Sequence, residues 1–153
     1  MKKHLIISIL LLLTLGSLFA QSSKRQAQFN LNNKIALQGY DPVAYFKQGK
    51  AVKGSSSFAV NVEGITYYCA SAADKTLLQA NPAAYEPQYG GWCAYAMGKS
   101  GEKVEIDPET FKIIGGKLYL YYNAFFNNTL TTWNKDEANL KKSADTNWKK
   151  FFN

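Results

Sequence analysis

The 153-residue sequence is short of the residues that most often carry catalysis and metal binding. It contains one histidine, two cysteines and two methionines. The histidine is His4, so the chain from residue 21 onward has none. Without an imidazole, the usual base for a serine or cysteine nucleophile is missing, and zinc sites of the Cys/His kind are disfavoured. Redox or soft-metal chemistry would therefore have to involve Cys69 or Cys93.

Long apolar runs are also scarce, and the longest covers residues 5–15. A cationic start formed by Lys2 and Lys3 precedes this run, and small residues follow it up to Ala20. This three-part layout is typical of a secretory signal peptide, and the run is shorter than the roughly 20 residues that a membrane span needs. We predict that residues 1–20 are a signal peptide, and that the mature protein is secreted to the periplasm without a stable membrane anchor.

Charge and polarity narrow the class of protein further. Removal of Lys2 and Lys3 lowers the formal net charge from +7 to +5, and the densest basic stretch is residues 141–150. We find neither a nucleic-acid-binding motif nor a phosphate-binding glycine loop, so a nucleic-acid partner is not expected. Residues 21–32 are rich in Ser, Gln and Asn and are expected to form a flexible leader. The length of the rest, residues 33–153, suits a single domain that includes the C-terminal helices.

Local patterns predict an α+β fold. Asp41 followed by Pro42 marks the start of a short helix. Alternating segments around glycine-containing turns predict two hairpins, at residues 58–69 and 111–122. Further helices are expected at residues 72–85, from Asn123 to about Trp133, and at residues 137–152. The expected architecture is a small antiparallel sheet built from hairpins, with several short helices packed on it and a C-terminal helical segment.

Cys93 is the first candidate for a functional site, because it follows a glycine pair and lies between large aromatic residues. Three roles are open to it. It is a buried packing thiol, or a reactive thiolate favoured by a helix N-terminus if residues 92–97 are helical, or a ligand of a soft ion such as Cu(I) together with Met97 and Cys69. A disulfide between Cys69 and Cys93 is a further alternative in an oxidising compartment.

The order of motifs resembles the secreted branch of the YHS-domain family. The matching segments are residues 39–46 (GYDPVAYF), 64–71 (GITYYCAS), 81–94 (NPAAYEPQYGGWCA) and 116–120 (GKLYL). This resemblance implies a small α+β domain that is often metal-associated, with relatives attached to heavy-metal pumps and to some oxygenases. Some secreted members are selenoproteins, and the selenocysteine position matches Cys93. Cys69 departs from the aromatic residue usual at its position, and the broader family's cysteine ligands are largely missing.

From these observations we expect an exported YHS-type accessory or binding module in metal or redox homeostasis, centred on Cys93. The expected partner is a metal-transport or redox protein, and the candidate metal ligands are Cys93, Met97 and Cys69. Enzymatic activity is not the favoured hypothesis. Two alternatives stay open: a thiol-dependent oxidoreductase that uses Cys93, and a structural domain without chemistry.

Overall fold

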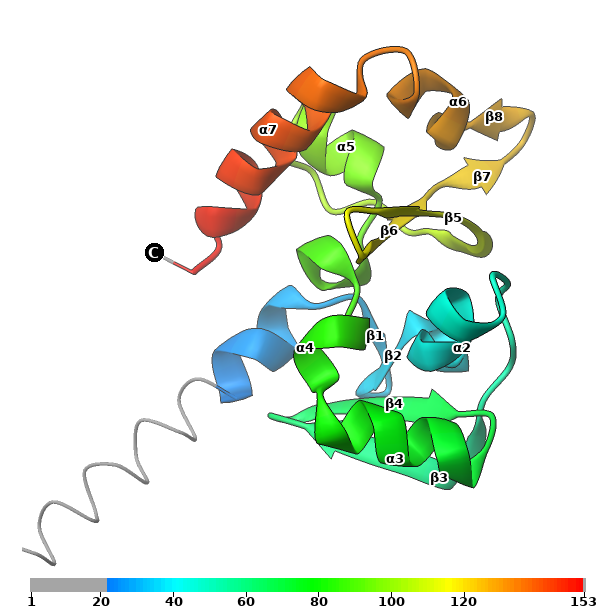
Figure 1. The fold of residues 1–153 in the computed structure, drawn as a ribbon. Helices are drawn as coiled ribbons and strands as arrows, with labels where there is room; N and C mark the ends of the chain where they lie inside the picture. The colour runs from blue at the N-terminus through cyan, green and yellow to red at the C-terminus, as the bar shows by residue number, and fades with distance from the viewer. Residues whose placement is uncertain (1–21, 153) are drawn as a thin grey trace, which may run out of the picture.

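The structure is a computed structural model that describes residues 22–152, whose elements form two stacked groups (Figure 1). The lower group in Figure 1 comprises strands β1 (Leu31–Asn32), β2 (Ile35–Ala36), β3 (Ser55–Val62) and β4 (Ile65–Cys69) and helices α2 (Pro42–Lys47), α3 (Ala72–Ala80) and α4 (Pro82–Tyr85). The upper group comprises strands β5 (Asp107–Ile114), β6 (Lys117–Tyr121), β7 (Asn123–Ala124) and β8 (Asn127–Asn128) and helices α5 (Ala94–Lys99), α6 (Thr129–Trp133) and α7 (Glu137–Lys149). The predicted α+β class is confirmed.

The strands form three sheets, whereas the sequence predicted one. Strands β1, β2, β4 and β3 lie side by side in that order, β5 pairs with β6, and β7 pairs with β8. The β2–β4 pair is parallel and the other pairs are antiparallel. Both predicted hairpins are confirmed as β3–β4 and β5–β6. Glu63 and Gly64 turn the first at positive φ, as Gly115 and Gly116 turn the second.

The stretch expected to be a flexible leader is folded wherever the structure describes it. Residues 22–28 are helical, Phe29 and Asn30 are buried, and β1 follows. Arg25 anchors this helix, because its Nη2 lies 2.6 Å from Glu86 Oε1 and its guanidinium lies 4.6 Å from the centre of the Phe29 ring. Composition alone missed this contact, since the Glu86 partner lies far away in sequence. The predicted signal peptide, residues 1–20, lies outside the described residues.

The helix expected from Asn123 to about Trp133 is wrong over its first half. Asn123 pairs with Asn128 and Ala124 with Asn127, so these residues form the β7–β8 hairpin. Helix α6 begins only at Thr129, because the Asn128 side chain accepts a hydrogen bond from the Leu130 N–H at 3.0 Å. The predicted cap, Asn123, is therefore wrong: Asn123 lies in β7, and the residue that caps α6 is Asn128, five residues later in the chain.

Two hydrophobic clusters share strand β6. Leu118 and Leu120 belong to the first cluster, which also contains both cysteines. Tyr119 and Tyr121 belong to the second cluster, which also contains Met97, Trp133 and Ala144. All four β6 residues are at most 2% exposed. Because side chains alternate along a strand, β6 presents one face to each cluster and joins the two groups of elements.

Asp41 is a fully buried carboxylate that ties helix α2 to the end of strand β4. Its Oδ1 accepts the backbone N–H of Val43 at 2.7 Å and that of Ala44 at 3.4 Å, which caps α2. Its Oδ2 accepts the N–H of Ala70 at 2.6 Å. Burial raises the pKa of Asp41, and the hydrogen bonds from the three amides oppose that rise. The sequence predicted the cap but not the bond to Ala70.

We predict that Asp41→Ala lowers the free energy of unfolding by about 2–4 kcal/mol, because it removes a helix cap and leaves buried N–H groups without an acceptor. Asp136→Ala is the matched control. Asp136 holds the N-cap position of α7 but is exposed and makes no side-chain capping bond, so its loss is expected to cost at most about 0.5 kcal/mol. Urea denaturation measures both. Equal losses would show that Asp41 is not the link we describe.

Candidate functional site

Cys93 lies where the lower group of elements passes into the upper one. The 3-10 turn η2 (Gln88–Gly91) leads into it, and Cys93 occupies the N-cap position of α5. Its N–H donates to the Val104 carbonyl at 3.0 Å, and its backbone forms a parallel bridge with Leu120 of β6. Gly90 is needed in this turn, because a Cβ there would lie 2.8 Å from the Trp148 ring at a φ of +60°.

The Cys93 sulfur is enclosed in a closed set of hydrogen bonds. It is 0% exposed and accepts the Tyr122 N–H at 3.3 Å. Thr129 Oγ1 lies 3.4 Å from the sulfur and donates its own proton to the Tyr122 carbonyl at 2.9 Å. Since a hydroxyl has only one proton to donate, the thiol must be the donor toward Thr129. The sulfur therefore serves as both donor and acceptor within the core.

Cys69 ends strand β4 and is also fully buried. Burial raises the pKa of the Cys69 thiol to about 12, and the nearby carboxylate of Asp41 adds to the rise. Both cysteines are free thiols, so the disulfide considered from the sequence is not formed in this structure. Residues Ile65, Tyr67 and Cys69 share the buried face of β4, as the strand period predicted.

Met97 lies one helical turn after Cys93, and its N–H donates to the Cys93 carbonyl at 3.0 Å. Its side chain belongs to the second cluster, whereas Cys69 and Cys93 belong to the first. Within residues 22–152, no group of three or more His, Cys, Asp or Glu side chains is arranged to hold a metal ion. A soft ion at Cys93 would have to displace the contacts with Tyr122 and Thr129. The part of the chain that the structure describes therefore shows no assembled metal site, and the ligand roles of Cys69, Cys93 and Met97 stay predictions.

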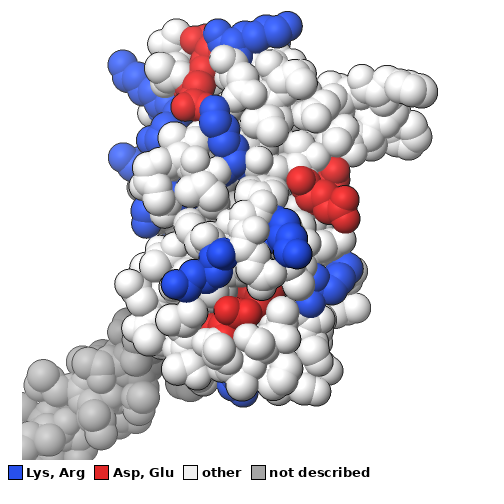
Figure 2. All heavy atoms as spheres, turned by 45° about the vertical axis from the view of Figure 1, so that its right-hand side comes forward, with Lys and Arg blue, Asp and Glu red and all other residues white. Residues whose placement is uncertain are grey.

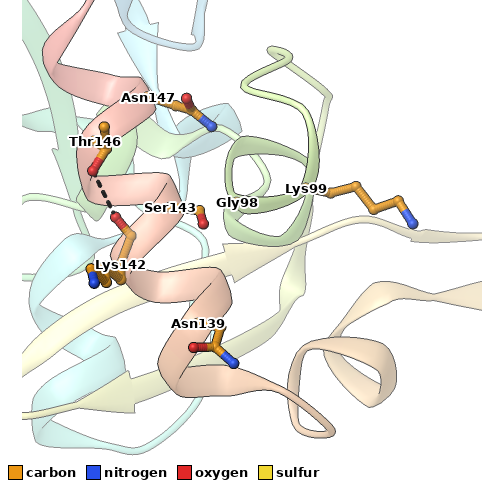
Figure 3. A pocket seen from close by; sticks show the side chains of 7 residues that line it. All are labelled: Gly98, Lys99, Asn139, Lys142, Ser143, Thr146 and Asn147. Atoms are coloured by element: carbon orange, nitrogen blue, oxygen red, sulfur yellow. Dashed lines mark hydrogen bonds between the residues drawn. The ribbon is translucent and has the colours of Figure 1, made fainter.

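A cleft of about 510 Å³ lies between α5 and α7 (Figure 3). The helices approach closely there, because Gly98 lies against the Leu140 backbone and Asn147 Nδ2 donates to the Met97 carbonyl at 2.9 Å. Figure 3 shows Lys99 and Lys142 extending in different directions, Lys99 pointing away from α7. The polar side chains around the cleft do not converge on one point, so its geometry does not define a ligand site.

The feature that sequence reasoning missed is the β7–β8 hairpin. Phe125 and Phe126 form its two-residue turn, and their relative exposures are 92% and 111%. Both adopt positive φ, 51° and 62°, a region that bulky residues rarely occupy. The hairpin projects from the upper group in Figure 1, and Figure 2 shows an uncharged arm in the corresponding place. Residues 118–134 contain no Asp, Glu, Lys or Arg. Adjacent phenylalanines flanked by turn-forming asparagine were the available signal.

The root of this hairpin rests on Cys93. Tyr122 and Thr129, the residues immediately before and after the hairpin, are the two partners of the Cys93 sulfur. A second anchor is Asn123, whose Nδ2 donates to Thr110 Oγ1 at 3.0 Å. The buried thiol thus contacts both ends of the hairpin that carries the exposed phenylalanine pair.

Comparison of the chain with protein-family models, with curated protein sequences and with solved structures gave no match. The YHS resemblance therefore stays a prediction. No helix within residues 22–152 is both long and apolar enough to cross a membrane.

We predict that neither thiol of the folded protein reacts readily with iodoacetamide at pH 8, because both sulfurs are buried and reaction must await local opening. Labelling is expected to be at least about 100-fold slower than that of an unfolded chain. Ser57→Cys, which places a thiol on an exposed position of β3, is the reactive control. Rates followed by mass spectrometry decide the matter. Rapid labelling of Cys93 in the folded protein would contradict the sealed arrangement.

Proposed function

We propose that this chain is a non-catalytic binding module of the YHS type, in which the β7–β8 hairpin is the contact element and Cys93 is a positioning residue. One observation carries the proposal: Phe125 and Phe126 are exposed on a hairpin whose two ends are held by the buried Cys93 sulfur. Export to the periplasm and a role in metal or redox homeostasis remain predictions. In this proposal, the role in metal or redox homeostasis depends on a partner protein that the hairpin binds.

Energetics favour a binding role for the phenylalanine pair. Burying a phenylalanine side chain is favourable by about 1.5–3 kcal/mol of free energy. The free protein does not gain this free energy at Phe125 or at Phe126, because both side chains are exposed. Left-handed backbone costs a further 1–2 kcal/mol or so for each residue of this kind. A partner that buries both rings would gain the burial free energy of the two side chains. The ordered hairpin also reduces the entropy lost on binding.

The same geometry gives less support to thiol or metal chemistry. The reactive-thiolate hypothesis placed Cys93 in the first turn of a helix over residues 92–97, whereas α5 begins at Ala94 and Cys93 holds the N-cap position before it. Its sulfur is also fully buried and already engaged by Tyr122 and Thr129. A substrate or ion would reach the sulfur only if the root of the hairpin opened. A positioning role uses the contacts of Cys93 as they are.

We predict that Cys93→Ala loosens the hairpin, because it removes the acceptor of the Tyr122 N–H and the donor toward Thr129. Amide exchange at Tyr122 is expected to become at least about fivefold faster, the effect of losing roughly 1 kcal/mol of hydrogen bonding. Backbone NMR relaxation of residues 123–128 should show larger motions on the nanosecond timescale.

Cys69→Ala is the matched control, because it removes an equally buried thiol from the lower group of elements. Both variants are expected to lose stability through the cavity that they create. Only Cys93→Ala should change the dynamics of the hairpin. Equal hairpin dynamics in the two variants would remove the positioning role and, with it, the proposed function.

A further inference from the structure

We infer that Phe125 and Phe126, here named the aromatic tip, dock into an apolar pocket of a partner protein whose rim is cationic. This inference rests on the proposed binding role and specifies the chemistry of the partner. The pair is adjacent, almost fully exposed and held on a hairpin of fixed register, Ala124 opposite Asn127 and Asn123 opposite Asn128. An exposed pair of this kind belongs to the aromatic residues that are enriched at protein interfaces.

The surroundings of the aromatic tip are polar but uncharged. Asn123 and Asn127 are exposed beside it, and Asn128 is half-buried. Protein interfaces typically place aromatic residues at the centre and polar groups at the rim, where they form hydrogen bonds. Two phenylalanines flanked in the chain by polar, uncharged asparagines match that arrangement. It therefore favours a partner that offers both an apolar pocket and hydrogen-bonding groups around it.

Acidic residues lie beside the root of the hairpin. Asp107 Oδ2 lies 3.5 Å from Asn123 Nδ2, and Glu109, two residues further along β5, is exposed. Figure 2 shows acidic side chains gathered beneath the uncharged arm, while basic side chains lie mostly elsewhere on that face. The chain as a whole has a net charge of +7, so this acidic site is a local exception. Complementary charge on the partner would be positive.

Two other occupants fit less well. A tip-to-tip dimer would bury four phenylalanine side chains of about 200 Å² each, roughly 800 Å² in all, whereas stable interfaces bury about 1,200 Å² or more. A bilayer would meet the acidic residues at the hairpin root, and residues 118–134 lack the Lys and Arg that strengthen binding to anionic lipid. A partner protein can bury the aromatic tip and can also place positive charge beside the acidic residues at the hairpin root.

The test is photocrosslinking in cells of the source organism with the full chain. p-Benzoylphenylalanine replaces Asn127, which is exposed and next to the aromatic tip, and in a control it replaces Ser57 on β3. The Asn127 probe is expected to give a discrete protein adduct that the Ser57 probe does not give. Mass spectrometry of the crosslinked peptide should place it beside apolar residues with Lys or Arg nearby.

Three variants examine the chemistry of that adduct. Combined Phe125→Ser and Phe126→Ser should reduce its yield at least about tenfold, and Glu109→Lys should reduce it about threefold through charge repulsion. Ile113→Ser is the matched control: Ile113 is an exposed apolar residue of β5, and its loss should leave the yield unchanged. Circular dichroism confirms that each variant is folded.

Other outcomes overturn the inference. These are an adduct with a second copy of the chain, no adduct dependent on the aromatic tip, or tip-dependent sedimentation with vesicles of phosphatidylethanolamine and phosphatidylglycerol. A tip-dependent adduct that Glu109→Lys does not weaken would overturn the cationic rim alone and leave the proposed binding role intact. The proposed function itself fails by a different measurement, unchanged hairpin dynamics in Cys93→Ala.

Discussion

The alternation of side chains along β6 is the constraint on which the rest of the structure depends. One strand supplies Leu118 and Leu120 to one cluster and Tyr119 and Tyr121 to the other, and all four are buried. A shift of one residue in the register of β6 would turn the two tyrosines toward the first cluster and the two leucines toward the second. The pairing of β6 with β5 and the bridge between Leu120 and Cys93 hold that register.

Cys93 gains its importance from this arrangement. The end of β6 continues through Tyr122 into the β7–β8 hairpin, and Thr129 is the first residue after the hairpin. A sulfur placed between the two residues links the buried strand to the projecting hairpin. A cysteine suits this place because it is small, apolar and able to act as both weak donor and weak acceptor. In this structure both capacities are engaged by Tyr122 and Thr129.

Much of the fold could be predicted from the sequence because its signals are local. The Asp41–Pro42 helix start, the glycine turns of both longer hairpins and the inward face of β4 depend on neighbours within a few residues. The folded N-terminal helix could not be predicted in this way, since the partners of Arg25 are Glu63 and Glu86, both distant in the sequence. The β7–β8 turn escaped for another reason, because two phenylalanines at positive φ contradict ordinary turn preferences.

The sequence by itself determined the fold class, the two longer hairpins, the starts of helices α2 and α3 and the choice of Cys93 as a residue of interest, because periodicity, caps and composition act locally. Only the tertiary structure decided what surrounds Cys93. The reason is that burial and hydrogen bonding depend on which distant segments meet. Residues 122 and 129 contact residue 93 and enclose its sulfur, and Phe125 and Phe126 lie exposed in the hairpin between those two residues.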